Sequence, residues 1–143
     1  NLGLDWSLYG WARQDGTGVG FDSSTGFTLP NGATRSPDLA WVRRTRLMGL
    51  TAKEKEKFLP LCPDFVVELR SPTDQLSNLQ AKMQEYMENG AQLGWLIDPV
   101  GQQVYVYRPD LQPTRLDRPM TVSGDPVLPG FVLELSIIWD PGF

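Results

Sequence analysis

The order of elements between residues 63 and 108 constrains the fold more than any other feature of the sequence. An apolar run predicts a strand, the amphipathic stretch after it predicts a helix, and two β-prone runs around a Pro-Val-Gly-Gln turn predict a hairpin. The predicted segments are a strand at 65–69, a helix capped by Asp74 and ended by Gly90, and hairpin strands at 94–98 and 103–108. Because an amphipathic helix must cover an apolar surface, this order predicts a mixed α/β domain with the helix packed on a sheet.

Further elements are predicted on both sides of this core. They are an N-terminal helix ending near Asp15, a glycine-rich extended stretch at 18–29, a turn at Pro30 to Gly32 leading to a partner strand at 39–43, a short helix opened by a capping box at Thr51 and stopped by Pro60, and a last strand at 131–135. No internal repeat or long linker divides the chain, so we expect a single domain over residues 1–143. Because the sequence begins at Asn1 inside a helical pattern, we also expect this domain to lack its N-terminal segment.

The composition excludes several kinds of catalytic site, metal site and covalent cross-link. The chain has no histidine, so it cannot form a Ser-His-Asp or Cys-His nucleophile system or a His-ligated zinc site. Its single cysteine, Cys62, cannot form an internal disulfide and fits the reducing cytoplasm, which is the expected location. No apolar run approaches the roughly 18 residues of a membrane span. The net charge of −4 argues against broad adhesion to nucleic acid but leaves room for a local basic surface.

Glu68 is the one acidic residue inside a run that is otherwise typical of a protein core. Side chains alternate along a strand, so Glu68 shares one face with Val66 and Arg70, while the other face is apolar. One interpretation is that Glu68 and Arg70 line a partly solvated face and pair with each other. The other is that Glu68 faces a polar cleft and binds a cation. Because Mg²⁺ is usually held by one or two carboxylates, the second interpretation calls for another carboxylate nearby.

Two Pro-Asp pairs, at residues 37–38 and 63–64, could supply that second carboxylate. An aspartate after a proline at the start of a strand commonly has a turn or capping role. Asp64 lies about 13 Å from Glu68 along an extended strand, which is too far for both to bind one ion directly. Asp38 precedes a short apolar strand that could lie beside the Glu68 strand. We therefore predict Asp38 as the partner of Glu68.

Lys82 lies at the edge of the apolar stripe of the predicted helix. Such a lysine is commonly a surface residue whose apolar stem packs along the helix while its ammonium stays in water. It can also reach over the sheet to position an attacking water or to offset charge on a phosphate. Helical geometry favours the first role but leaves the second open.

Four blocks of the sequence, taken in order, resemble the Uma-type restriction endonuclease family, a bacterial family of the PD-(D/E)XK nuclease superfamily. The blocks are RSPDLAWV, PDFVVELRSPTD, LQAKMQEYMENGAQLGWLIDP and QVYVYRP. Each block alone is weak, but their order and spacing are fairly specific, and the resemblance extends over about residues 18–135. It implies a restriction-endonuclease-like core, which is a central mixed β-sheet with flanking α-helices.

The resemblance also implies a site. Asp38 and Glu68 would be metal-coordinating carboxylates for Mg²⁺ or Mn²⁺, and Lys82 would be the catalytic lysine. The sequence departs from the usual superfamily pattern, in which the lysine follows the glutamate by two residues on the same strand, because Arg70 holds that position. The resemblance implies that the lysine has moved to the next helix, where Lys82 lies. Arg70 could stand in as the cation, but a guanidinium cannot be deprotonated to act as a base.

The implied activity is metal-dependent hydrolysis of phosphodiester bonds in nucleic acid, and we expect the nucleic acid to be DNA. Arg43, Arg44 and Arg46 form a small basic cluster, and together with Arg70 and Tyr86 they are predicted to contact substrate. A solvated turn at the start of a helix explains the three clustered arginines equally well. A homodimer is plausible because it would supply one site for each of two strands.

Two other functions are compatible with the sequence. The same fold could be a catalytically inactive binding or assembly module, which the acidic net charge and Arg70 favour and the presence of Asp38, Glu68 and Lys82 opposes. Convergence of those three residues within metal reach would discriminate the two. A sugar-binding protein is a weaker idea, because the aromatic residues concerned lie on predicted strands, where aromatics are ordinarily core. They are Trp41, Trp95, Tyr105 and Tyr107.

Overall fold

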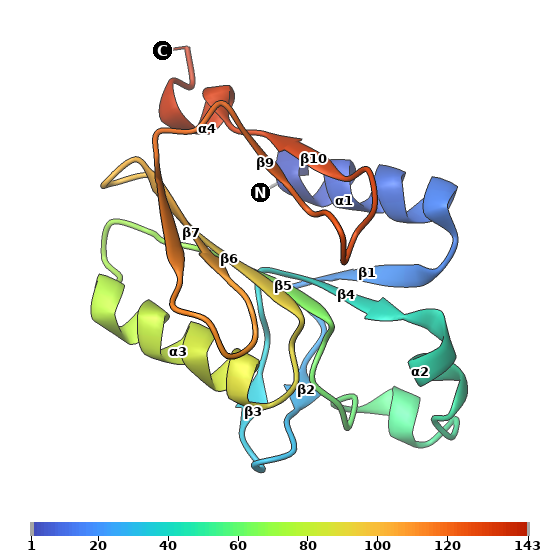
Figure 1. The fold of residues 1–143 in the computed structure, drawn as a ribbon. Helices are drawn as coiled ribbons and strands as arrows, with labels where there is room; N and C mark the ends of the chain where they lie inside the picture. Colours follow the sequence, from blue (N-terminus) through green and yellow to red (C-terminus); the bar gives the residue numbers. More distant parts are fainter. Residues whose placement is uncertain (1, 143) are drawn as a thin grey trace.

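A six-stranded mixed sheet runs through the centre of the protein, as the computed structural model shows (Figure 1). Its strands are, in spatial order, β1 (Gly18–Asp22), β4 (Leu39–Arg43), β5 (Phe65–Leu69), β6 (Leu93–Asp98), β7 (Gln103–Tyr107) and β8 (Thr114–Asp117). The β5–β6 pair is parallel, and the other neighbouring pairs in this sheet are antiparallel. The structure describes residues 2–142, so residues 1 and 143 of the expected domain lie outside it.

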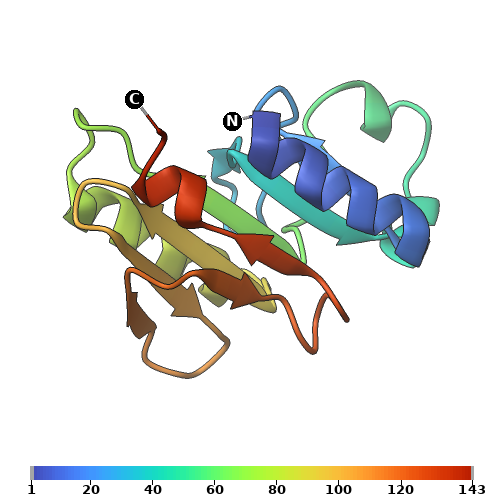
Figure 2. The same ribbon diagram turned by 90° about the horizontal axis from the view of Figure 1, so that it is seen from above.

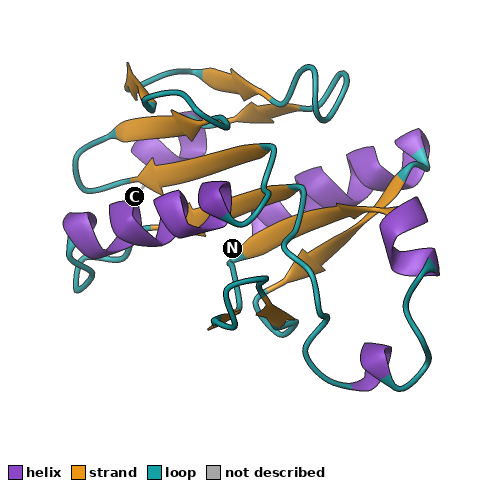
Figure 3. Ribbon diagram, turned by 60° about the horizontal axis from the view of Figure 1, so that its bottom comes forward, coloured by secondary structure: helices purple, strands orange, loops and turns teal. Residues whose placement is uncertain are grey.

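Helices and two small strand pairs cover both faces of this sheet. The helices are α1 (Leu2–Asp15), α2 (Arg44–Met48), the 3₁₀ turn η1 (Glu54–Glu56), α3 (Leu76–Glu88) and α4 (Ser136–Trp139), and the additional strands are β2 (Phe27–Thr28), β3 (Thr34–Arg35), β9 (Thr121–Ser123) and β10 (Val132–Glu134). Helix α1 and the β9–β10 pair lie over one face, as the view from above shows (Figure 2). Helix α3 and the β2–β3 hairpin lie against the opposite face (Figure 3). The expected central mixed sheet with flanking helices is confirmed.

The two faces of the sheet carry separate apolar cores because side chains alternate along β4 and β5. Trp41 and Phe65 belong to the core on the α1 side, whereas Ala40 and Val66 belong to the core on the α3 side. The residues that α3 buries in this second core are Leu79, Met83 and Tyr86. The face of β5 that carries Glu68 is therefore covered by α3 and shielded from solvent.

Helix α3 begins without the predicted aspartate cap. Its N-cap residue is Gln75, which makes no side-chain cap hydrogen bond. Asp74 instead accepts hydrogen bonds from the backbone N–H and the hydroxyl of Ser71, at 3.0 and 2.9 Å. The prediction was wrong because an aspartate can close a turn before a helix as readily as it can cap the helix itself. The helix ends near Gly90 as predicted, and this glycine adopts the left-handed conformation with φ 113°.

Two further predictions are confirmed only in part. Strand β4 pairs with β1 as predicted, but the turn at residues 30–32 closes the small β2–β3 hairpin. Thr51 and Glu54 form the predicted reciprocal capping box, but the helix that follows is only η1. Strands β8 and β9 lie in the proline-rich stretch at 109–129, where no element was predicted. Proline is tolerated at strand edges and ends, so its abundance hid these two strands.

The burial of the strand aromatics tests the sugar-binding alternative, and the helix lengths test the expectation that no segment spans a membrane. Trp41 and Trp95 are fully buried, and Tyr107 is nearly so. They are core residues as predicted, and they present no exposed aromatic face on which a sugar ring could stack. No helix among residues 2–142 is long and apolar enough to cross a lipid bilayer.

Candidate active site

The register of β4 on β5 places Asp38 opposite Glu68. Leu39 pairs with Val67 and Ala40 with Val66, so continuing this antiparallel register by one residue matches Asp38 to Glu68. Residues opposite each other on antiparallel strands point to the same face of the sheet, with Cβ atoms about 5 Å apart. The two carboxylates therefore share the face that α3 covers.

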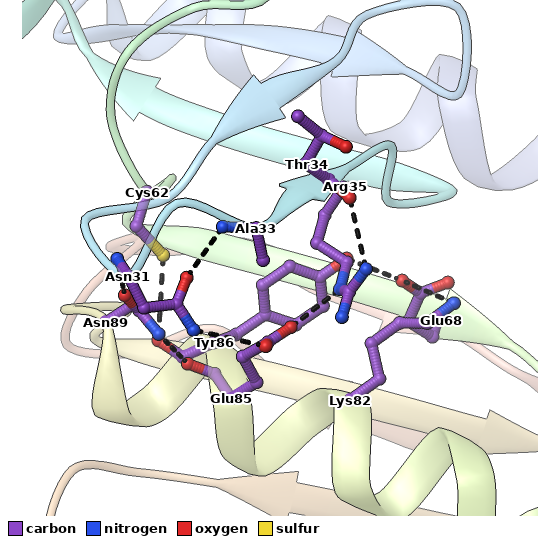
Figure 4. Close-up of polar contacts among 10 residues, drawn as sticks. All are labelled: Asn31, Ala33, Thr34, Arg35, Cys62, Glu68, Lys82, Glu85, Tyr86 and Asn89. Atoms are coloured by element: carbon purple, nitrogen blue, oxygen red, sulfur yellow. Dashed lines mark hydrogen bonds and ion pairs between the residues drawn. The ribbon is translucent and has the colours of Figure 1, made fainter.

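Hydrogen bonds hold both carboxylates in this arrangement. The backbone N–H of Leu69 donates to Asp38 Oδ2 at 2.7 Å, which ties Asp38 to the end of β5. The hydroxyl of Tyr86, on α3, donates to Glu68 Oε2 at 2.8 Å (Figure 4). Glu68 is 4% exposed, whereas Asp38 is half-buried. The pair therefore lies at the edge of the core, with one carboxylate accessible from solvent.

Lys82 approaches the same pair from α3. Its Nζ lies 3.9 Å from Glu68 Oε2, and 37% of its side chain is exposed (Figure 4). Tyr86 follows Lys82 by one helical turn, so a single helix face presents an ammonium and a hydroxyl to Glu68. The structure thus brings together Asp38, Glu68 and Lys82, which we call the carboxylate site. Its ammonium contacts both the buried carboxylate and solvent.

The surroundings of Glu68 raise its pKa from 4.5 to about 7. Burial is the largest cause, because loss of hydration destabilises the charged form. The Lys82 ammonium and the Tyr86 hydrogen bond lower the pKa, while the charge of Asp38 and a side-chain hydrogen bond with Asp38 raise it. Burial and the neighbouring Glu68 raise the pKa of Tyr86, so its hydroxyl stays protonated and remains a donor. Additional positive charge beside Glu68 would favour its ionised form.

The donor set of the carboxylate site fits a hard divalent cation. Mg²⁺ prefers oxygen ligands and is commonly held by one or two carboxylates, with water and substrate phosphate completing its coordination. Asp38 and Glu68 supply two carboxylates on one face, and a cation between them would offset the repulsion that raises the pKa of Glu68. Among residues 2–142, no group of three or more His, Cys, Asp or Glu side chains could hold a metal ion. A cation here would complete its coordination with other oxygen ligands, such as water and substrate phosphate.

Comparison with known proteins places the chain in a family. The family model described as "Uma2: Putative restriction endonuclease" matches residues 2–136. The chain belongs to the Uma2 family. A solved structure described as "a putative nuclease belonging to DUF820 from Anabaena variabilis ATCC 29413" is similar, with a TM-score of 0.81 and 22% sequence identity. The similarity covers 95% of this chain and 75% of that chain. No curated protein matches.

The Uma2 match confirms the family resemblance, and the structural similarity confirms the expected restriction-endonuclease-like fold. At 22% identity, the structural similarity speaks for the fold alone. The roles of Asp38, Glu68 and Lys82 remain predictions, which their convergence on one face supports.

Arg70 pairs with Asp98 in this Uma2 chain, and the suggested pairing with Glu68 is therefore wrong. Its guanidinium Nη1 lies 3.1 Å from Asp98 Oδ2, and its Nε donates to the backbone carbonyl of Asp74 at 3.2 Å. The parallel register that pairs Leu69 with Ile97 carries Arg70 to the level of Asp98. Sequence reasoning missed Asp98, because a parallel register leaves no local signal beyond an acidic residue at the end of an apolar run.

The other four residues predicted to contact substrate fall into two groups. Three arginines lie away from the carboxylate site, and Tyr86 is buried within it. Arg43, Arg44 and Arg46 lie at the opposite end of β4 from Asp38. Arg46 forms an ion pair with a buried aspartate, Asp64, at 3.0 Å, whereas Arg43 and Arg44 are exposed. Tyr86 is fully buried, with its hydroxyl committed to the carboxylate site. Contact of these residues with substrate stays a prediction.

A polar network holds the β2–β3 hairpin against α3 beside the carboxylate site (Figure 4). Arg35 Nε donates to Glu85 Oε1 at 2.6 Å, and Asn31 Nδ2 donates to Glu85 Oε2 at 3.2 Å. The backbone N–H of Asn31 donates to Asn89 Oδ1 at 2.9 Å. Sequence reasoning missed this network, because its contacts join residues 50 or more positions apart. It anchors the segment that leads into Asp38.

Proposed function

We propose that this protein is a metal-dependent nuclease that hydrolyses phosphodiester bonds of DNA at the carboxylate site. The observation that carries the proposal is the convergence of Asp38, Glu68 and Lys82 from the start of β4, from β5 and from α3. Membership of a family described as restriction endonucleases supports a nuclease function and a nucleic acid substrate. The fold shared with a protein described as a nuclease is consistent with it.

Each residue of the site has a distinct role in this proposal. Asp38 and Glu68 would hold Mg²⁺ or Mn²⁺, which supplies Lewis-acid charge to a scissile phosphate when bound. The half-exposed ammonium of Lys82 can donate hydrogen bonds to an attacking water or to a phosphate oxygen, and it offsets the negative charge that develops there. Tyr86 is a positioning residue, because its hydrogen bond sets the orientation of the Glu68 carboxylate.

The test is cleavage of labelled DNA in the presence of Mg²⁺ or Mn²⁺ by the wild type and by Lys82→Met and Glu68→Gln. Loss of a group that stabilises charge in the transition state commonly lowers the rate about 10²- to 10³-fold, so we expect both variants to lose at least that much. Glu88→Gln is the matched control, since Glu88 lies exposed at the end of the same helix. It should cut at the wild-type rate.

Two results would contradict the proposal. If Lys82→Met cuts as fast as the wild type, the activity arises elsewhere or from a contaminant. If the wild type binds DNA but cuts it with neither metal, the catalytically inactive binding or assembly module becomes the better account of the fold.

A further inference from the structure

A second surface of the protein lies on the same face of the sheet as the carboxylate site but beyond the far end of β4. A pocket of about 850 Å³ opens there between β1, α2 and residues 55–59. Its walls include the apolar side chains of Phe21, Leu47, Met48 and Phe58. The β2–β3 hairpin lies between this region and α3 in Figures 1 and 3.

Two of these apolar side chains are open to solvent. Met48 is 73% exposed and Phe58 is 52% exposed. The Phe58 ring packs against Gly26 so closely that a Cβ there would lie 2.0 Å from a ring carbon, so only glycine permits this placement. An aromatic ring that is supported on one side and exposed on the other can stack against a flat, apolar ligand.

The rim of the pocket is strongly basic in an acidic protein. Residues 43–58 contain six Lys and Arg and two Glu, a net charge of +4 in a chain whose net charge is −4. Arg44, Lys55 and Lys57 line the pocket together with one carboxylate, Glu56, so these lining residues carry a net charge of +2. No ion pair within 4 Å is found for the three cations among residues 2–142. Unpaired cations around an apolar pocket favour a ligand that is an anion and also carries an aromatic or apolar group. The rest of the protein surface is acidic and would repel such an anion from other sites.

We propose that residues 43–58 and this pocket bind a single-stranded stretch of DNA, with one unstacked base against Phe58 and neighbouring phosphates on Arg44, Lys55 and Lys57. Sites for single-stranded nucleic acid combine a basic surface that follows the backbone with aromatic side chains on which bases stack. The bases of a duplex are already stacked, so they would not enter the pocket. The choice of nucleic acid as ligand rests on the proposed function, whereas the single-stranded form follows from the pocket.

The position of the pocket is compatible with a strand that also reaches the carboxylate site. Asp38 and Arg43 lie at opposite ends of β4, which separates them by about 17 Å along the strand. Nucleotides of one strand advance about 3.4 Å each in a duplex and farther when extended, so about five or fewer would cover this distance. The pocket lies beyond Arg43, so a strand that reached both sites would span more than this distance.

The experiment is fluorescence anisotropy with a labelled oligothymidylate of about 12 nucleotides, in EDTA so that no cleavage occurs. Phe58→Ala should weaken binding about tenfold or more, as expected for loss of base stacking. The double variant Lys55→Gln/Lys57→Gln should reduce the slope of log K against log salt by about 1.4, the value for two lost contacts to single-stranded phosphate. Met120→Ala and Arg115→Gln remove comparably exposed side chains away from the pocket and should bind like the wild type.

Competition with unlabelled duplex DNA and with oligouridylate completes the test. Preference for the oligothymidylate over both supports the proposal, and tighter binding of either competitor overturns it. Wild-type affinity in the Phe58 and Lys55/Lys57 variants also overturns it. If these variants bind normally while the wild type cuts DNA, the pocket proposal fails and the proposed function stands. If binding depends on the pocket but the wild type never cuts, the nuclease proposal fails and the binding site stands.

Discussion

The two Pro-Asp sequences of this protein lie at opposite ends of the same pair of strands and in opposite environments. Asp38 faces Glu68 and accepts the backbone N–H of Leu69 at 2.7 Å. Asp64 lies 3.0 Å from Arg46, accepts the backbone N–H of Arg43 at 2.9 Å and is 5% exposed. Asp38 faces another carboxylate, and a bound cation would offset their repulsion, whereas Asp64 already pairs with a cation, Arg46.

This difference shows that the same dipeptide can face a carboxylate or pair with an arginine, depending on which side chains the neighbouring elements place beside it. An aspartate paired with an arginine contributes to stability, because removing either partner leaves a buried charge or donor uncompensated. An aspartate placed against a buried glutamate opposes stability when both are ionised, and a bound cation would offset that repulsion. Substitutions at Asp38, Glu68 and Asp64 should therefore have different effects on activity and stability.

Asp38→Asn should lower DNA cleavage at least about 10³-fold, which corresponds to about 4 kcal/mol of transition-state stabilisation. The amide oxygen can still accept the Leu69 N–H, so the fold should survive while the negative charge is lost. The measurement is the rate of cleavage at saturating Mg²⁺, with unfolding by urea as the check on stability. Wild-type cleavage by this variant would show that Asp38 is not a metal ligand.

Glu68→Gln should stabilise the metal-free protein above pH 7. The folded-state pKa of Glu68, about 7, exceeds its ordinary value of 4.5. The protonated Glu68 therefore makes its full contribution to the free energy of unfolding below pH 4.5. That contribution falls as the pH rises to about 7, by up to ~3 kcal/mol, because the unfolded chain ionises Glu68 more easily than the folded protein does. Glutamine has no proton to lose, so it avoids this loss.

Urea unfolding of the wild type and of Glu68→Gln over this pH range measures the difference. The gap in free energy of unfolding should be small below pH 4.5 and should widen through pH 7. Equal stability of the two proteins above pH 7 would mean that Glu68 ionises freely in the folded state. It would then be no more than a polar residue on a solvated strand face.

Asp64→Asn should have the smallest and opposite effect, a loss of about 1–3 kcal/mol in the free energy of unfolding. The asparagine can still accept the Arg43 N–H, but it loses its charge partner, Arg46. Cleavage per folded molecule should match the wild type. If Asp64→Asn and Asp38→Asn reduced cleavage equally, the two aspartates would not have the separate roles that their environments indicate.

Local patterns predicted the part of the fold that carries the site. The apolar run at residues 65–69, with side chains alternating between its two faces, predicted β5, and the apolar stripe of the following helix predicted α3. The turn at 99–102 predicted the β6–β7 hairpin. The same alternation predicted that Glu68 and Val66 share a face. Pairing Asp38 with Glu68 required only that their strands be neighbours, and the assignment of the lysine to position 82 came from the family resemblance.

Contacts between distant residues could not be predicted in the same way. The Arg70–Asp98 pair depends on the parallel register of β5 and β6, which no turn specifies. The network from Arg35 to Glu85 joins a hairpin to a helix across 50 positions. The unexpected turn around Asp74 had a local cause, since one aspartate side chain can close several alternative turns.

Calorimetric titration of Mg²⁺ into the wild type, Asp38→Asn and Asp64→Asn, with a short DNA duplex present, tests the central claim most directly. The carboxylate site predicts that the wild type and Asp64→Asn bind Mg²⁺ with similar affinity and that Asp38→Asn loses this binding. Equal binding by Asp38→Asn and the wild type, or no binding by any of the three proteins, would contradict the assignment of Asp38 and Glu68 as a metal site.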